Sequence, residues 1–153
     1  MRIGHSSSPI EKSIFLAGPT PRRHDVKSWR PEAISILEKI GFDGTVYVPE
    51  PEGWQSSIDY DDQVHWEWEA LNAATVVAFW IPRDMIDMPA LTTNVEFGLL
   101  VNSGKVVVGY PEYSPKNKYI GKLADRFFIP IQKTLYDTMC EAKAMTKGIY
   151  GFD

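Results

Sequence analysis

The chain alternates short apolar runs with segments in which apolar residues recur at every third or fourth position. The runs predict buried strands, and the recurring pattern predicts amphipathic helices. The expected strands are residues 13–17, 46–48, 75–82, 105–110 and 127–131, and the expected helices are 28–40, 59–74, 93–103, 120–126 and 133–145. The polar stretches 1–12 and 148–153 are expected to form no element of their own.

The alternation of strands and helices predicts an α/β protein with a parallel sheet covered on both faces. A length of 153 residues fits a single domain, residues 1–153. For about five strands we expect the doubly wound order 2-1-3-4-5, in which ligands bind outside the carboxyl ends of the first and third strands. Two loops, residues 18–21 and 83–92, would flank that crevice.

The helix predicted between the third and fourth strands contains the first candidate catalytic residue, Glu96. We expect Thr93 to cap this helix and Gly104 to end it, which places Glu96 in the first turn. Thr93-Asn94-Val95-Glu96 fits a capping box, in which the glutamate bonds back to the cap's backbone. In the other interpretation Glu96 is a nucleophile, because a helix N-terminus favours the ionised form that attacks a sugar carbon in retaining glycosidases.

A second carboxylate, Glu67, lies at the margin of the apolar face that Val64, Trp68 and Leu71 predict for residues 59–74. A carboxylate at such a margin needs a partner or a function. Glu67 therefore either pairs with a lysine or caps a loop, or it faces a substrate as an acid whose pKa burial raises.

The loop at 18–21, Gly-Pro-Thr-Pro, carries neither the G-x-G-x-x-G fingerprint nor a phosphate loop ending in Gly-Lys-Ser/Thr. Gly18 either lets a ligand approach the backbone or only makes a tight turn. The loop at 83–89 is rich in apolar residues. It is either a lid, with Asp84 or Asp87 facing the ligand, or a loop that packs locally.

Tryptophans crowd the same region of the chain. We assign Trp68 and Trp80 to the core. Trp66 lies off the predicted apolar stripe, so it is a candidate to line a pocket for a flat ring.

Composition narrows the classes of function. The net charge of −4 argues against general binding to a nucleic acid polymer or to an anionic membrane. The pair Arg22-Arg23 is either a phosphate contact or part of a solvated loop. One cysteine, Cys140, permits no disulfide within the chain and favours a reducing compartment.

We expect no metal and no other cofactor, because the cysteine and the three scattered histidines, His5, His24 and His65, have no metal-ligand spacing. No apolar run reaches the roughly 18 residues of a membrane helix. The N-terminal residues lack the apolar segment of a signal peptide. We therefore expect a cytoplasmic protein.

Several segments together resemble one enzyme family. Ile14-Phe15-Leu16-Ala17-Gly18-Pro19, Trp66-Glu67 with the following Ala70-Leu71 and Val76-Val77, and above all Asn94-Val95-Glu96-Phe97-Gly98 with Ser103-Gly104-Lys105, look like the nucleoside 2-deoxyribosyltransferases and their relatives. The resemblance covers roughly residues 13–145. Its most specific part is the Glu-Phe-Gly sequence after the third strand.

The resemblance implies a flavodoxin-like fold and an enzyme that exchanges the bases of 2′-deoxyribonucleosides. Glu96 would be the nucleophile that forms a covalent deoxyribosyl intermediate, and Glu67 would orient the base or pass its proton. The partners would be nucleosides and free nucleobases, in a homo-oligomer whose sites borrow groups from neighbouring subunits. Asn117 matches a group that binds the sugar 5′-hydroxyl; with the crevice residues, the expected substrate-binding set is Gly18, Pro19, Thr20, Trp66, Asp84, Thr93, Asn94 and Asn117.

The chain departs from that family at two places. Phe15 stands where several transferases have a tyrosine that orients the nucleophile, so Tyr60 or Thr93 would have to hold Glu96 instead. The chain ends in Gly151-Phe152-Asp153, whereas some members end in a tyrosine that reaches a partner's site.

Two other functions stay open. The same site would hydrolyse an N-glycosidic bond if water replaced the acceptor base, and Thr20, Arg22, Thr92 and Thr93 would then be donors for a 5′-phosphate. A non-enzymatic flavodoxin-like binding or signalling module is the third possibility. Ala17-Gly18-Pro19 argues against a receiver, which needs an acidic pair at that position.

Overall fold

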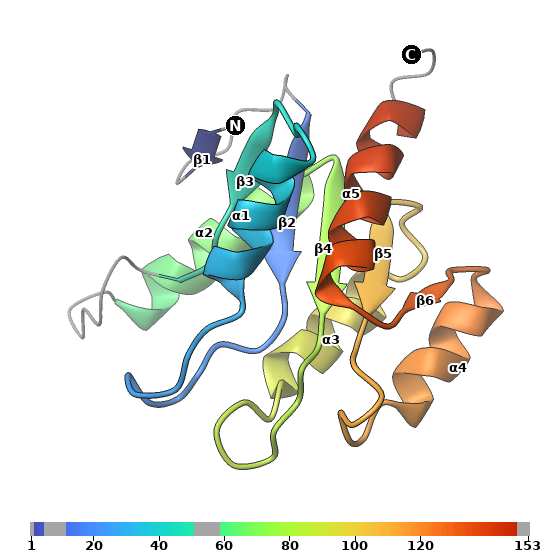
Figure 1. The fold of residues 1–153 in the computed structure, drawn as a ribbon. Helices are drawn as coiled ribbons and strands as arrows, with labels where there is room; N and C mark the ends of the chain where they lie inside the picture. Colours follow the sequence, from blue (N-terminus) through green and yellow to red (C-terminus); the bar gives the residue numbers. More distant parts are fainter. Residues whose placement is uncertain (1, 5–11, 51–58, 150–153) are drawn as a thin grey trace.

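The computed structural model describes residues 2–4, 12–50 and 59–149 (Figure 1). Within these ranges the chain forms six strands and five helices. In chain order they are β1 (Arg2–Gly4), β2 (Ser13–Ala17), α1 (Arg30–Lys39), β3 (Thr45–Tyr47), α2 (Tyr60–Ala73), β4 (Val76–Trp80), α3 (Leu91–Leu100), β5 (Val106–Gly109), α4 (Lys118–Arg126), β6 (Ile131–Gln132) and α5 (Leu135–Ile149). None of the helices in these ranges combines the length and the apolar character needed to cross a bilayer.

All strand pairs in the sheet are parallel, and the strand order is β1-β3-β2-β4-β5-β6. The five predicted strands are β2 to β6, so their order is the expected 2-1-3-4-5. The central pair is β2 and β4, with Ile14 opposite Val76 and Ala17 opposite Phe79. The protein therefore has the predicted doubly wound α/β fold, with the change of direction between β2 and β4.

Strand β1 was not expected, because it lies in a stretch predicted to have no element. It pairs with the outer edge of β3, with Arg2 opposite Thr45 and Gly4 opposite Tyr47. The prediction for the C-terminal tail was also wrong in part, since α5 continues to Ile149. Residues 150–153, which include the predicted departure at Gly151-Phe152-Asp153, lie outside the described ranges. Backbone pairing at a sheet edge leaves no apolar period from which it can be predicted.

The helices cover both faces of the sheet. Helices α1 and α5 lie in front of the sheet in Figure 1, and α2, α3 and α4 lie behind it. Side chains of β4 pack against the helices on both faces of the sheet, because successive side chains of a strand point to opposite faces. Val77 and Phe79 pack with the residues of α2, α3 and α4, whereas Val76, Ala78 and Trp80 pack with those of α1 and α5.

Helix α2 packs against the sheet through a different stripe from the one predicted. Trp66 faces inward, with its ring centroid 6.3 Å from that of Phe15 and 6.5 Å from that of Tyr47. Trp68 was assigned to the core but is 60% exposed. The inward stripe runs through Trp66, Ala70 and Leu71. The predicted stripe shares Leu71 with the observed one but has the wrong tryptophan, because an exposed tryptophan cannot be told from a buried one by its residue type alone.

A strand was predicted at 127–131, but the strand in the structure is only residues 131 and 132. The first residues of the predicted strand form the C-terminal cap of α4 instead. Phe128 takes a left-handed conformation with φ 59°, and the Ile129 N–H donates to the Ala124 carbonyl at 2.8 Å. This is the hydrogen-bond pattern of a Schellman cap, which usually has glycine at the left-handed position. An apolar run at the end of a helix was therefore taken for a strand.

Phe97 packs α3 against the sheet. Its ring is fully buried and contacts the Phe79 ring edge to face, with 5.2 Å between the ring centroids. We expect Phe97→Ala to lower the free energy of unfolding by about 3–5 kcal/mol, because it leaves a cavity in the core. Phe128 is 93% exposed, so the matched variant Phe128→Ala should change it by less than about 0.5 kcal/mol. Urea unfolding of both variants measures the difference; equal losses would contradict this packing.

Candidate active site

A cavity of about 380 Å³ opens at the carboxyl end of β2, beside β4. This is where the strand order predicts a ligand. Its volume lies within the roughly 300–1,000 Å³ of small-molecule sites. The lining residues come from the end of β2 and the loop after it, the starts of α1 and α3, the inner face of α2 and the loop after β3: Phe15, Ala17, Gly18, Pro19, Thr20, Arg22, Arg30, Pro49, Tyr60, Gln63, Val64, Glu67, Pro89, Ala90, Leu91, Thr92, Thr93 and Glu96.

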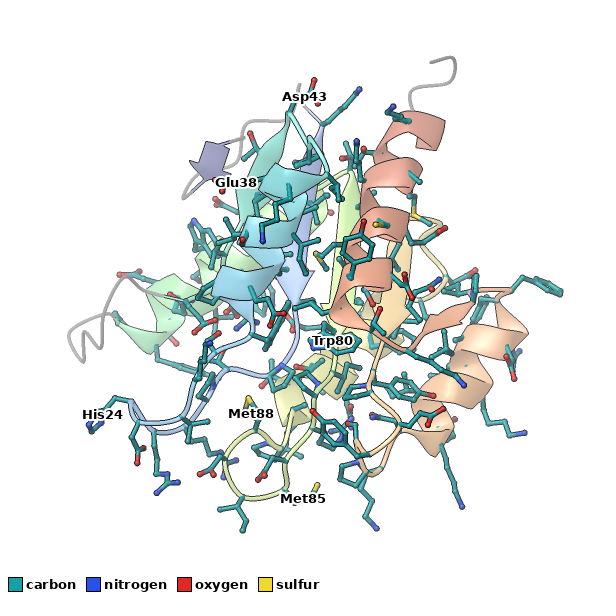
Figure 2. All side chains as sticks on the ribbon, in the orientation of Figure 1. His24, Glu38, Asp43, Trp80, Met85 and Met88 are labelled. Carbon is teal, nitrogen blue, oxygen red and sulfur yellow. The ribbon has the colours of Figure 1, made fainter. Side chains whose placement is uncertain are left out.

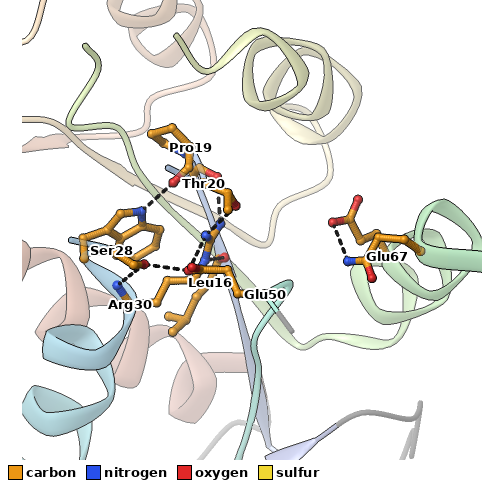
Figure 3. A network of polar contacts seen from close by, with 10 residues as sticks. Leu16, Pro19, Thr20, Ser28, Arg30, Glu50 and Glu67 are labelled. Carbon is orange, nitrogen blue, oxygen red and sulfur yellow. Dashed lines mark hydrogen bonds and ion pairs between the residues drawn. The ribbon is translucent and has the colours of Figure 1, made fainter. Parts of the chain in front are cut away.

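One wall of the cavity is built around the side chain of Arg30, which is only 2% exposed (Figure 3). Its Nε donates to the Leu16 carbonyl at 3.0 Å, and Nη2 donates to the Gly18 carbonyl at 2.7 Å. Nη1 donates to Thr20 Oγ1 at 2.9 Å and pairs with Glu50 at 2.7 Å. A single cation therefore ties the loops after β2 and β3 to the start of α1.

The residues before Arg30 reinforce this wall. The Trp29 ring lies 4.8 Å from the guanidinium carbon, and its Nε1 donates to the Pro19 carbonyl at 3.0 Å. Ser28 Oγ donates to Glu50 at 2.6 Å and accepts from the Arg30 backbone N–H at 3.2 Å. Ser28, predicted as the cap of α1, thus lies one residue before the observed N-cap Trp29 and contributes to the loop network.

Gly18 is needed at the end of β2 because the protein's own atoms crowd it. Its φ is 154°, and a Cβ there would lie 2.1 Å from the Trp80 carbonyl oxygen and 2.7 Å from the Trp29 ring. No side chain fits in that space. The glycine therefore allows close packing of β2, β4 and α1 at the floor of the cavity.

Helix α3 begins earlier than predicted, which changes the position of Glu96 within it. The N-cap is Ala90, in a left-handed conformation with φ 60° and ψ 39°, and no side chain caps the helix. Thr93 is therefore inside the first turn and Glu96 falls in the second. The capping-box interpretation of Glu96 is wrong, because the residue at its supposed cap already lies within the helix. Glu96 instead lines the cavity.

Burial controls the charge of Glu96. It raises the pKa of the Glu96 carboxyl from 4.5 to about 7; the negative charge of Glu67 adds to the rise, and Arg30 opposes it. The helix N-terminus, which was expected to favour the ionised form, acts within the first turn, and Glu96 lies beyond that turn. Glu96 therefore gains or loses its proton near neutral pH.

Glu67 lies on the inner face of α2, on the opposite side of the cavity from the Arg30 network (Figure 3). Its Oε1 accepts from Gln63 Nε2 at 3.2 Å. Burial raises the pKa of Glu67, while the Gln63 hydrogen bond and the charge of Arg30 oppose the rise. The direction agrees with the expectation for a carboxyl at an apolar margin, and the partner of Glu67 is an amide rather than a lysine.

The structure brings together about half of the residues expected in the site. Gly18, Pro19, Thr20 and Thr93 line the cavity with Glu67 and Glu96, as do Arg22, Tyr60 and Thr92. The cavity wall does not include Trp66, Asp84, Asn94 or Asn117. Trp66 packs on the sheet, so its proposed role beside a flat ring is not supported by its position.

Asp84 organises its own loop instead of facing the cavity. Its Oδ1 accepts from the backbone N–H groups of Ile86 and Asp87 at 2.8 and 2.9 Å, and these bonds lower the pKa of its carboxyl. Asp87 joins this loop to the loop after β2, because its carboxylate pairs with Arg23 at 3.0 Å and its carbonyl accepts from the Arg22 N–H at 2.9 Å. Figure 2 shows Met85 and His24 at the outer ends of these two loops.

Asn94 and Asn117 both bind the buried side chain of Arg83. Their Oδ1 atoms accept from Arg83 Nη2 at 2.7 and 2.9 Å. Asn117 is 4% exposed and also donates to Ser114 Oγ at 2.8 Å, so its amide lies inside the protein and not at a surface where a 5′-hydroxyl would approach. No group of three or more metal-ligating side chains lies together among residues 2–4, 12–50 and 59–149.

Sequence analysis missed Arg30, the cation of the site. A charged residue at the start of an amphipathic helix normally lies in solvent. The neighbouring Trp29 was the one available signal, because a tryptophan beside the predicted cap suggests that this helix start is covered. The carbonyls that Arg30 binds lie 12 and 14 residues away in the chain, so only the tertiary structure shows that its charge is satisfied.

The fold and the cavity define the class: a doubly wound α/β protein with two partly buried carboxyls and a buried arginine at the switch point of its sheet. A family model described as nucleoside 2-deoxyribosyltransferase-like matches residues 11–114, more than half of the chain. The chain belongs to this family. Every residue that lines the cavity lies within the matched segment. A search of curated proteins finds no match.

The raised pKa of Glu96 predicts how stability depends on pH. The folded state binds this proton more tightly than the unfolded chain, so the stabilisation is complete below pH 4.5 and is lost as the pH rises through about 7. Glu96→Gln has no carboxyl to ionise. Its free energy of unfolding minus that of the wild type should therefore be up to roughly 3 kcal/mol larger at pH 8 than at pH 4.

Urea unfolding of wild type and variant at both pH values gives this difference. The control is Glu69→Gln, which removes the same charge from the exposed side of α2. If the gain of Glu96→Gln at pH 8 does not exceed that of the control, burial of Glu96 does not control its charge.

Proposed function

We propose that the protein is a nucleoside 2-deoxyribosyltransferase that exchanges the base of 2′-deoxyribonucleosides through a deoxyribosyl intermediate on Glu96. The single observation that carries the proposal is the cavity itself. Both Glu96 and Glu67 line this cavity, which lies at the switch point of the sheet, and Glu96 is not part of a helix cap. Membership in the nucleoside 2-deoxyribosyltransferase-like family supports the same reaction.

In the first step the Glu96 carboxylate bonds to C1′ of the sugar as the bond from C1′ to the base nitrogen breaks. The electron pair of the broken bond stays on the base, which gains a proton and leaves. The transition state has oxocarbenium character, so a negative carboxylate beside C1′ stabilises it. A second base then attacks C1′, releases Glu96 and loses its proton, which retains the configuration of the sugar.

Glu67 faces the base in this scheme and either orients it or passes the proton. Burial raises the pKa of both carboxyls, and the negative charge of Glu67 adds to the rise at Glu96. An ionised Glu67 accepts hydrogen bonds from the N–H groups of a base and so orients it, whereas a protonated Glu67 donates its proton to the leaving nitrogen.

Base exchange tests the proposal directly. Wild-type protein mixed with deoxyinosine and adenine should form deoxyadenosine, and the rate should rise as the pH increases through about 7, because only ionised Glu96 attacks. Glu96→Ala should lower the rate by at least about 10³-fold. Chromatography of the products measures both effects, with Glu69→Ala on the outer side of α2 as the control. Absence of deoxyadenosine, or full activity of Glu96→Ala, would refute the proposed reaction.

A second candidate function is hydrolysis of the N-glycosidic bond of a nucleoside or its 5′-monophosphate. Arg22, Thr20 and Thr92 all line the cavity and could donate to a phosphate. The same assay distinguishes this candidate when it is run without adenine, on deoxyinosine and on its 5′-monophosphate. Base released without any acceptor supports hydrolysis, and a strict requirement for the acceptor supports exchange.

We also propose that the protein forms a homo-oligomer through α3. Leu91, Val95 and Leu99 make an exposed apolar row along this helix, each at least 62% exposed. The first of them lies at the rim of the cavity. Two such rows can pair across a two-fold axis without bringing like charges together, since the row carries none.

Light scattering after size exclusion tests this assembly. Val95→Lys should lower the mass from a multiple of 17.3 kDa towards that of one chain, because it buries an unpaired charge in the interface. Tyr136→Lys, at a 55% exposed position on α5, should leave the mass unchanged. A wild-type mass of one chain would exclude the oligomer.

A further inference from the structure

Arg83 is a second buried arginine, three residues beyond the end of β4, and lies outside the cavity wall. It is 3% exposed. Its Nη1 donates to the Pro89 carbonyl at 2.6 Å, and its Nη2 donates to Asn94 at 2.7 Å and to Asn117 at 2.9 Å. The guanidinium therefore joins the loop before α3, the first turns of α3 and the N-cap of α4.

The backbone of Arg83 is held in the same network. Ser114 Oγ accepts from the Arg83 N–H at 2.9 Å and donates to the Ile81 carbonyl at 2.8 Å. Asn117 donates to the same hydroxyl. The Ser114 hydroxyl thus joins the Arg83 backbone to the chain just after β4, whereas the contacts to the start of α3 are made by the guanidinium itself.

The charge of Arg83 has no carboxylate partner among the ion pairs of the described residues, and its buried Nε has no hydrogen-bond partner there. Burying such a cation is unfavourable, and desolvation lowers its pKa. An apolar residue would avoid that cost. What only arginine offers is a rigid fork that reaches several acceptors on separate elements at once.

The acceptors of this fork lie where α3 begins in an unusual way. Ala90 is left-handed, a conformation that is unfavourable for residues other than glycine, and α3 has no side-chain cap. Arg83 binds the carbonyl of the residue before Ala90, and Asn94 in the first turn after it. It thereby holds both sides of the turn that decides where the helix starts.

The start of α3 decides where Glu96 lies. The cavity is lined by Pro89, Ala90, Thr93 and Glu96, but not by Asn94. Arg83 therefore contacts α3 at a residue outside the cavity wall. A helix started at Thr93, as its local sequence predicts, would turn Glu96 back toward its own N-terminus. Arg83 favours the observed start over that alternative.

We propose that Arg83 is a positioning residue that sets the start of α3 and thereby holds Glu96 in the cavity wall. This inference rests on the proposed function only for the role of Glu96 as the attacking group. Arg83 acts through the helix and not through its charge. The charges that shift the pKa of Glu96 are those of Glu67 from α2 and Arg30 from α1; Arg22 and Tyr60 also line the cavity, and Arg83 does not.

Two variants remove the contact between the Arg83 guanidinium and the start of α3, and one matched variant keeps it. Arg83→Lys keeps the charge but loses the fork, and Asn94→Ala removes the acceptor on α3. Ser114→Ala damages the same buried network but leaves the guanidinium on Pro89 and Asn94, so it should lower thermal stability alone. Asn94 has an exposed side chain, so its variant carries the test if Arg83→Lys does not fold.

Two readouts follow the position of Glu96. The first is the pH profile of kcat/KM for base exchange, whose acid-side midpoint should move from about pH 7 to lower pH by at least about one pH unit in Arg83→Lys and Asn94→Ala as water reaches the carboxyl. The maximal rate should fall about 10–100-fold in both. The second is a carbon NMR titration of the glutamate carboxyls, in which the Glu96 signal is the one missing from Glu96→Gln.

A shift of the Glu96 titration in Arg83→Lys and Asn94→Ala, and none in Ser114→Ala, supports the proposal. An unmoved titration in the first two, or an equal shift in all three, overturns it. An inactive wild type whose Glu96 titration still shifts as expected would refute base exchange and leave the positioning role of Arg83 intact.

Discussion

The contacts of one buried guanidinium, that of Arg30, underlie the shape and the charge of the cavity. Water is excluded from this cation, so it must be satisfied by the protein, and its acceptors come from the loops after β2 and β3. A buried ion pair rarely stabilises a fold by itself, because desolvation offsets the attraction. Its effect here is geometric: its hydrogen bonds to Leu16, Gly18, Thr20 and Glu50 hold the two loops against the start of α1.

The same cation sets the charge balance between the two glutamates. Arg30 is already paired with Glu50 at 2.7 Å, so only part of its field is left for Glu67 and Glu96. Two carboxyls in a partly dry cavity cannot both ionise easily. Glu96 therefore keeps its proton until about pH 7. In the proposed reaction, a carboxyl that ionises close to neutral pH is charged when needed but poorly stabilised by its surroundings, which would suit attack on a sugar carbon.

Errors of prediction fell where local patterns competed with tertiary contacts. Thr-Asn-Val-Glu is a sound capping box by itself, but Arg83 binds the backbone before Ala90 and favours an earlier helix start. Trp66 was predicted to line a pocket and Trp68 to lie in the core, but Trp66 packs against Phe15 and Tyr47 from two strands and Trp68 is exposed. Asn117 was expected at a substrate, yet it is a buried acceptor for Arg83. In each case the deciding partner belongs to another segment of the chain.

The amino-acid sequence by itself determined the parallel doubly wound sheet, the order of its five predicted strands and the crevice beside β2 and β4. Apolar periodicity and the chirality of strand crossovers are local or general constraints, which is why they can be read without a structure. It also determined which two carboxylates would lie at that crevice. Only the tertiary structure decided that Glu96 is uncapped, that Arg30 is buried beside it and that its pKa is close to 7. These properties depend on burial and on the distances between charges from different elements, and no local pattern of residues encodes either one.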